Sequence, residues 1–150
     1  MGQLPKIALP LERYQQLVDL RDLLNAPSFS AAIGELIKTF AEIGKIEHSL
    51  PGVDIRAATD GFVIRFDGTT AAGMSYEDAM HLVGAIREYL ADTKPRKTAL
   101  AHPTRDFIVK GIGRSVAIQF IKRKITKQFA PDIAADFADL LERNIAQANT

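Results

Sequence analysis

Two segments of the chain repeat the same pattern at an offset of 54 residues, and this repeat limits the possible folds more than any other feature. The first segment reads VDIRAATDGFVIRF from Val53, and the second reads FIVKGIGRSVAIQF from Phe107. Farther along, with one extra residue in the second copy, AMHLVGAIREYLA corresponds to AADFADLLERNIA. The register holds across a whole unit, which predicts a duplication with copies at about 53–93 and 107–147 and a linker at 94–106.

Each copy is expected to begin with a β-hairpin. Apolar residues alternate with other residues at 62–66 and at 116–120, and a period of two is typical of strands. The dipeptides Asp60-Gly61 and Gly113-Arg114 indicate a turn in front of each of these strands. Two paired strands are therefore predicted in each copy.

A helix is expected after each hairpin. In the first copy Ser75, followed three residues later by Asp78, has the spacing of a helix-capping pair. In the second copy Pro131 suits the first position of a helix, where a missing N–H costs little. Segment 124–129 also alternates and fits a third strand. We therefore expect an α+β protein in which residues 51–150 form a duplicated strand-strand-(strand)-helix domain.

Residues 1–50 are expected to form a separate module of one short strand and two helices. Apolar residues alternate at 7–11, and helical spacing then continues until Asn25-Ala26-Pro27, where the proline ends the helix. Ser28 or Ser30 can cap the second helix. The segments IALPLERYQQL and SFSAAIGELIKTF resemble the ribbon-helix-helix family of DNA-binding proteins over about 40 residues.

This resemblance implies a homodimer whose paired strands enter the major groove of DNA. It implies that Lys6, Ala8 and Pro10 face the groove, and that Ser28 and Ser30 lie near the DNA backbone at the start of the second helix. Ala8 and Pro10 carry no side-chain donor or acceptor for base edges, so either the strand reads little sequence or the module serves only for dimerisation. A helical hairpin that packs on the repeat domain is the alternative.

Charge is distributed unevenly along the chain, although the net charge is only +1. Residues 1–50 carry five bases and six acids, and residues 51–93 carry three bases and seven acids. Residues 94–127 carry ten bases and one acid, whereas residues 128–150 carry one base and four acids. This polarity predicts a basic surface that binds an anionic partner.

The repeat offers an internal comparison for the basic residues. Where the second copy has IKRK at 121–124, the first copy has DGTT at 67–70, so the fold does not require bases at this position. The bases are therefore expected to contact another molecule, and a merely solvated loop is the alternative. The candidate nucleic-acid-binding residues are Lys6, Ser28, Ser30, Lys94, Arg96, Lys97, Lys110, Arg114, Lys122, Arg123, Lys124 and Lys127.

These features predict a DNA-binding homodimer, with DNA favoured over RNA, of the kind of small transcriptional or replication regulator found in bacteria, plasmids or phages. One alternative is a single-stranded nucleic-acid-binding protein, because the duplicated unit loosely resembles the PUR-repeat and Whirly type. Such proteins stack bases on aromatic side chains, and Phe107, Phe120 and Phe129 are the aromatic residues near the basic cluster. Another alternative is an interaction module or inhibitor that docks on an acidic partner protein.

Other classes of protein have little support in the sequence. The chain has no cysteine, which fits a reducing cytoplasm and excludes disulfides and thiolate metal sites. No apolar run is long enough to span a bilayer, and the first ten residues lack the apolar core of a signal peptide. The histidines His48, His81 and His102 are scattered, and no zinc-protease motif or P-loop occurs. We expect no enzymatic activity, cofactor, metal site or membrane partner.

Overall fold

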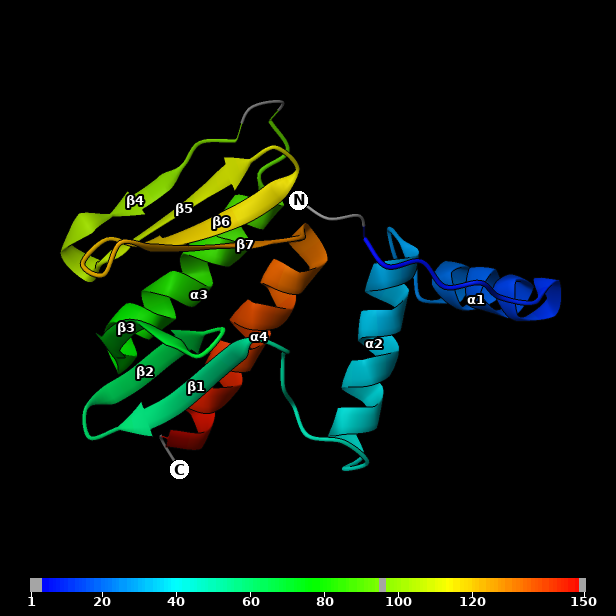
Figure 1. The fold of residues 1–150 in the computed structure, drawn as a ribbon, viewed down its shortest axis with the longest axis horizontal. Helices are drawn as coiled ribbons and strands as arrows, with labels where there is room; N and C mark the ends of the chain where they lie inside the picture. Colours follow the sequence, from blue (N-terminus) through cyan, green and yellow to red (C-terminus); the bar gives the residue numbers. More distant parts are fainter. Residues whose placement is uncertain (1–3, 95–96, 149–150) are drawn as a thin grey trace. The chain divides into compact units, whose positions relative to one another are not determined.

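The computed structural model describes residues 4–94 and 97–148 of the 150-residue chain, and its helices and strands confirm the expected α+β class. The chain divides into two compact units, Met1–Glu47 and His48–Thr150, which we call unit 1 and unit 2 (Figure 1). This division falls close to the expected boundary at residue 50. Among the described residues, no helix is long and apolar enough to cross a membrane.

Unit 1 contains two helices, α1 (Leu11–Leu23) and α2 (Phe29–Glu42). Ser28 caps α2, because its side-chain Oγ accepts a hydrogen bond of 3.1 Å from a backbone N–H in the first turn. This confirms Ser28, the first of the two expected caps. The rings of Tyr14 and Phe29 meet edge to face with centroids 5.7 Å apart and so join the two helices.

Residues 4–10, which precede α1, have no regular secondary structure within the single chain. The strand expected at 7–9 requires a partner for its backbone donors and acceptors. The resemblance to ribbon-helix-helix proteins places that partner in a second copy of the chain. The intermolecular ribbon therefore stays a prediction.

Unit 2 contains two antiparallel sheets and two long helices (Figure 1). The first sheet has the strand order β1-β2-β3, and the second has the order β4-β5-β6-β7. In chain order the elements are β1 (Val53–Ala58), β2 (Gly61–Phe66), β3 (Thr69–Ser75), α3 (Tyr76–Ala91), β4 (Leu100–His102), a short 3₁₀ turn (Pro103–Arg105), β5 (Phe107–Ile112), β6 (Ser115–Phe120), β7 (Ile125–Phe129) and α4 (Pro131–Ala148).

The two hairpins predicted from the repeat have the same register in the structure. Ile55 pairs with Ile64 in the first hairpin, and Val109 pairs with Ile118 in the second. Each hairpin continues into a third strand and then a helix, so the order strand-strand-strand-helix occurs twice. An origin of the two halves by duplication stays a prediction. Each residue of the first hairpin can nevertheless be compared with the residue 54 positions later in the second.

Two strands of unit 2 were not expected from the sequence. Strand β3 has the sequence TTAAGMS, in which the alanines and glycine have little strand preference, and it pairs with β2 along its length. Strand β4 is only three residues long and lies in the segment expected to be a linker. Both strands owe their conformation to a partner strand rather than to their own residues.

One hydrophobic core joins both sheets of unit 2 to both helices. The ring of Phe66, on the first sheet, lies with its centroid 5.8 Å from that of Phe120 and 5.9 Å from that of Phe129, both on the second sheet. Its centroid is also 5.8 Å from that of Phe137 on α4. Unit 2 therefore folds around a shared core, not around two separate ones.

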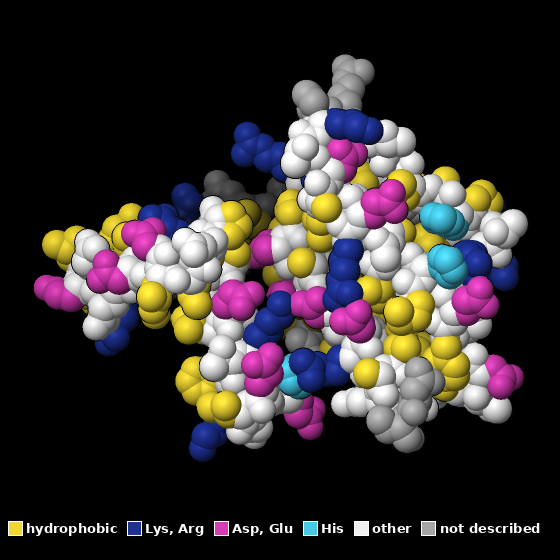
Figure 2. All heavy atoms as spheres, turned by 180° about the vertical axis from the view of Figure 1, so that it is seen from behind, with side chains coloured by type: hydrophobic (Ala, Val, Ile, Leu, Met, Phe, Trp, Pro, Cys, Tyr) yellow, Lys and Arg dark blue, Asp and Glu magenta, His cyan; other side chains and the backbone are white. Residues whose placement is uncertain are grey.

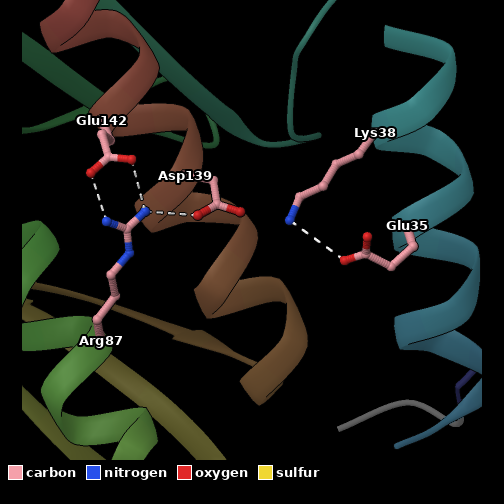
Figure 3. A network of polar contacts seen from close by, with 5 residues as sticks. All are labelled: Glu35, Lys38, Arg87, Asp139 and Glu142. Atoms are coloured by element: carbon pink, nitrogen blue, oxygen red, sulfur yellow. Dashed lines mark hydrogen bonds and ion pairs between the residues drawn. The ribbon is translucent and has the colours of Figure 1, made fainter. Parts of the chain in front are cut away.

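An ion-pair network links α3 to α4 on the surface of unit 2 (Figure 3). Nη1 of Arg87 lies 2.6 Å from Oε2 of Glu142, and Nη2 lies 2.9 Å from Oδ1 of Asp139. The hydrogen bonds to Glu142 and then to Asp139 raise the pKa of Arg87 above its ordinary value. Within α2, an ion pair joins Lys38 to Glu35 at 3.8 Å.

Candidate nucleic-acid interface

Basic residues of segment 94–127 occupy the turns at both ends of strand β6, and Lys110 and Lys127 lie opposite its middle. Arg114 is in the turn before β6, whereas Lys122, Arg123 and Lys124 are in the turn after it. Six residues at about 3.3 Å each separate these turns by roughly 20 Å. We call residues 122–124 the basic turn and treat the two ends separately.

The basic turn is a four-residue connection between β6 and β7. The last paired residues are Phe120 and Ile125, and the backbone N–H of Lys124 donates a hydrogen bond of 3.3 Å to the carbonyl of Ile121. Lys124 has a φ of 55°, in the left-handed region that glycine and asparagine adopt most readily. All three basic side chains are exposed. The tight turn therefore presents three cations on neighbouring residues.

Asp106 fixes the backbone of the basic turn through two hydrogen bonds. It is the one acid of segment 94–127 and is only 5% exposed. Its Oδ1 accepts a hydrogen bond of 2.6 Å from the backbone N–H of Lys122, and its carbonyl accepts one of 3.3 Å from Ile121. The carboxylate accepts from the backbone N–H of Lys122, so it fixes the path of the turn and forms no ion pair with the side chain of that residue.

The basic turn has no acidic partner, whereas several other bases of unit 2 do. Arg105 is paired with Asp78 at 2.7 Å, and Lys127 is paired with Asp67 at 2.9 Å. No acidic side chain within the described ranges 4–94 and 97–148 pairs with Lys122, Arg123 or Lys124. Their charges are available to an external anion.

Lys127 and Lys110, two of the expected binding residues, are engaged within unit 2. The side chain of Lys127 is 27% exposed and bridges from β7 to Asp67, which lies in the turn between β2 and β3. The Nζ of Lys110 donates a hydrogen bond of 3.1 Å to the side chain of Gln119 on the neighbouring strand. Lys127 therefore ties the two sheets together and is a weaker candidate for ligand contact than the basic turn.

Three further expected residues line one pocket at the other end of β6. Lys94, Lys97 and Arg114 surround a pocket of about 550 Å³ in unit 2. The two lysines come from the loop after α3, and the arginine comes from the turn between β5 and β6. Arg96, which was expected to act with them, lies outside the described residues.

The expected binding residues of unit 1 take different positions. Lys6 is exposed on the segment before α1. Ser28 uses its hydroxyl to cap α2, and Ser30 lies in the first turn of that helix. Both serines therefore lie at the start of α2, and their expected contact with a DNA backbone stays a prediction.

The aromatic residues considered for base stacking are in the core. Phe107 and Phe120 are 0% exposed, and Phe129 is 5% exposed. Stacking on single-stranded bases requires accessible ring faces. These three rings therefore support the fold and offer no stacking platform.

Two described carboxylates of unit 2 are paired with basic side chains. Asp54 pairs with Arg56 at 2.8 Å, and Asp67 pairs with Lys127. Nowhere in the described part of the chain do three or more histidine, aspartate or glutamate side chains gather as metal ligands would.

Sequence reasoning missed the roles of Asp106 and of the pocket. The isolation of Asp106 in a stretch of ten bases was a usable signal, because a lone acid among bases is a natural partner for backbone or side-chain donors. The pocket had no such signal, since Lys94 and Arg114 are separated in sequence by strands β4 and β5. Comparison with protein-family models, with curated proteins and with solved structures finds no match to this chain.

Proposed function

We propose that the protein is a DNA-binding homodimer in which the basic turn contacts the phosphate backbone and unit 1 joins the two copies. The observation that carries the proposal is the basic turn itself, with three exposed cations on consecutive residues and no acidic partner among the described residues. Phosphate contacts by lysine and arginine supply most of the affinity of proteins for nucleic acid. The resemblance of unit 1 to ribbon-helix-helix proteins favours duplex DNA and a regulatory role.

The conformation of Lys124 supports a role for its side chain. A residue with a side chain in the left-handed region is less stable there than glycine by about 1–2 kcal/mol. The turn between β2 and β3 has the same left-handed geometry, and its residues Asp67 and Gly68 tolerate it well. Stability alone would favour glycine or asparagine at position 124. A lysine at this position indicates that its charge has a use outside the fold.

The surface of unit 1 supports the homodimer. Twelve of the fourteen large hydrophobic residues that are exposed in the described chain belong to this unit, and α1 has no buried residue. Ile7, Leu11 and Leu23 are 75–82% exposed, and hydrophobic side chains are visible on the surface of the helices (Figure 2). Apolar surface on this scale is typical of an interface. A second copy would cover it and would supply the strand that pairs with residues 7–9.

The proposal can be tested with a triple variant, Lys122→Ala, Arg123→Ala and Lys124→Ala, in a mobility-shift titration on duplex and single-stranded DNA. We expect weaker binding to duplex DNA and a salt dependence flatter by about 0.9 log units for each phosphate that the variant no longer neutralises. The matched control removes three bases elsewhere, Lys45→Ala, Arg56→Ala and Arg143→Ala, and should bind almost as the wild type does.

The same experiment separates the other interpretations of the sequence. Preferential binding to single-stranded DNA would favour the single-strand alternative. Failure of the wild-type protein to bind either form at low salt would contradict the proposal and leave docking on an acidic protein. An equal loss of affinity in the triple variant and in the control would show that only net charge matters, and would also contradict a specific role for the basic turn.

A further inference from the structure

The pocket at the start of β6 has no part in the proposed contact of the basic turn with DNA, and its lining is specific enough to indicate its ligand. We propose that it binds the phosphomonoester group of a nucleotide, either a free nucleotide or the 5′ end of a nucleic-acid strand. The pocket is lined by Tyr89, Lys94, Lys97, Gly111, Gly113, Arg114, Ser115, Val116 and Pro131. The proposal goes beyond the DNA contact above and does not depend on it.

The three cations of the pocket are held in place by different parts of unit 2. Arg114 follows Gly113, whose φ of +59° fits the first central position of a two-residue turn between Ile112 and Ser115. Nζ of Lys97 lies 5.1 Å from the centroid of the Tyr89 ring, at the distance of a cation–π contact. These positions bring a planar guanidinium and ammonium groups to one cavity, the combination that proteins use for phosphate.

The charge of the pocket fits a dianion. The described residues of the lining include no acidic side chain. The carboxylate that interacts with the lysine loop is that of Asp92, whose Oδ1 accepts a hydrogen bond of 2.9 Å from the backbone N–H of Lys94. This hydrogen bond lowers the pKa of Asp92, which is therefore ionised. Three cations beside one carboxylate leave two positive charges, and a phosphomonoester carries about −1.5 to −2 at pH 7.

The size of the pocket indicates that the phosphate is attached to a larger group. A volume of about 550 Å³ lies within the usual range for pockets that hold small organic ligands. The apolar part of the lining comes from Tyr89, Val116 and Pro131. Pro131 is also the first residue of the 18-residue helix α4, so the positive end of the helix dipole is near the cavity. A nucleotide has both parts, a dianionic phosphate and a flat group that suits an apolar wall.

Two features of the hairpin suit the pocket. A Cβ at position 111 would collide with the hydroxyl of Tyr89, so Gly111 allows this ring to lie against β5 at the edge of the pocket. The corresponding tip of the first hairpin has Asp60 where the second has Arg114. An acid at that tip is therefore compatible with the hairpin, and the arginine is not needed for folding.

The test uses isothermal titration calorimetry of the full-length protein with adenosine 5′-monophosphate, with adenosine and with inorganic phosphate. We expect the monophosphate to bind and adenosine not to bind, with inorganic phosphate weaker than the monophosphate. Arg114→Asp, which copies the residue of the first hairpin, should weaken binding of the monophosphate by about tenfold or more, because the charge-assisted hydrogen bond is removed. Lys97→Ala is a second variant in case the first perturbs folding.

The basic-turn triple variant serves as the control and should bind the monophosphate as the wild type does, whether or not it binds DNA. Single-stranded oligonucleotides with a 5′-phosphate or a 5′-hydroxyl identify the source of the ligand. Displacement of the monophosphate only by the phosphorylated strand indicates a strand end, and displacement by neither indicates a free nucleotide. Equal binding of adenosine and its monophosphate, no binding of the monophosphate at millimolar concentration, or unchanged binding in both pocket variants would overturn the proposal.

Discussion

The carboxylate of Asp106 accepts a hydrogen bond of 2.6 Å from the backbone N–H of Lys122, sixteen residues later in the chain. Asp106 is almost fully buried and has a φ of 68°, so packing restricts its side chain and few residue types suit its backbone conformation. The basic turn is thus supported by an acid that neutralises none of its exposed side chains directly. This hydrogen bond connects the stability of unit 2 to the shape of its candidate DNA-binding surface.

We expect Asp106→Ala to destabilise unit 2 by about 1–3 kcal/mol, because a backbone donor loses its partner in a partly buried position. The amide of Lys122 should also exchange with solvent faster. Asp106→Asn is the matched control, since asparagine tolerates the left-handed region and keeps an acceptor oxygen. Urea unfolding and amide hydrogen exchange by NMR measure the two effects. Unchanged protection of the Lys122 amide in the alanine variant would show that the carboxylate does not hold the turn.

A second prediction compares equivalent positions in the two hairpins. A Cβ at Gly61 would collide with the backbone carbonyl of Met74, whereas the corresponding residue of the second hairpin is Ser115 and already has a Cβ. Gly61→Ala should therefore cost about 1–3 kcal/mol of unfolding free energy, as overpacking typically does. Ser115→Ala is the matched control and should be nearly neutral. Equal unfolding midpoints in urea for the two variants would contradict this account of β2 and β3.

The sequence predicted those parts of the fold that local patterns determine. Alternation identified strands β2 and β6, and the spacing of Ser75 and Asp78 identified the start of α3, where the Asp78 N–H donates to Ser75 Oγ at 3.1 Å. Strand β3 escaped prediction because its small residues have no strong preference and depend on pairing with β2. Local signals cannot report a conformation that a neighbouring strand imposes.

The sequence predicts the basic charge of the candidate site but not the positions and partners of its basic side chains. The count of ten bases to one acid identifies segment 94–127 as basic, and the binding role of its residues stays a prediction. Which bases are free depends on interactions such as that of Lys127 with Asp67, which are 60 residues apart in sequence. The division of the bases between two ends of β6 depends on the strand order of the second sheet. Both properties arise only when distant segments meet.

The ion pair between Arg87 and Glu142 predicts a contribution to stability that depends on pH. The hydrogen bond from Arg87 lowers the pKa of Glu142 in the folded protein. Its contribution is therefore complete above the ordinary glutamate pKa of about 4.3 and is lost as the pH falls through the lower folded value. Because Glu142 and Arg87 are 48% and 44% exposed, we expect about 1 kcal/mol or less.

The measurement for this ion pair is the urea midpoint between pH 7 and pH 3. Glu142→Gln should be less stable than the wild type at pH 7, and the difference should shrink in the acid range. Glu88→Gln is the control, because Glu88 lies exposed on α3 without an ion pair to any described residue. A difference between Glu142→Gln and the wild type that stays constant down to pH 3 would contradict the prediction.

The homodimer predicts a change of mass when the apolar face of α2 is altered. Ile37 and Phe40 are 50% and 52% exposed, and burying such side chains is worth about 1.5–3 kcal/mol each. Light scattering should give twice the chain mass of 16.5 kDa for the wild type, and the double variant Ile37→Asp, Phe40→Asp should be monomeric. Thr39→Asp introduces a charge on another side of the same helix and should remain dimeric.

A chain shortened to residues 48–150 should be monomeric and folded, because the hydrophobic core of unit 2 lies wholly within it. A monomeric wild type at micromolar concentration would refute the intermolecular ribbon, and the apolar face of unit 1 would then have to be covered within the same chain.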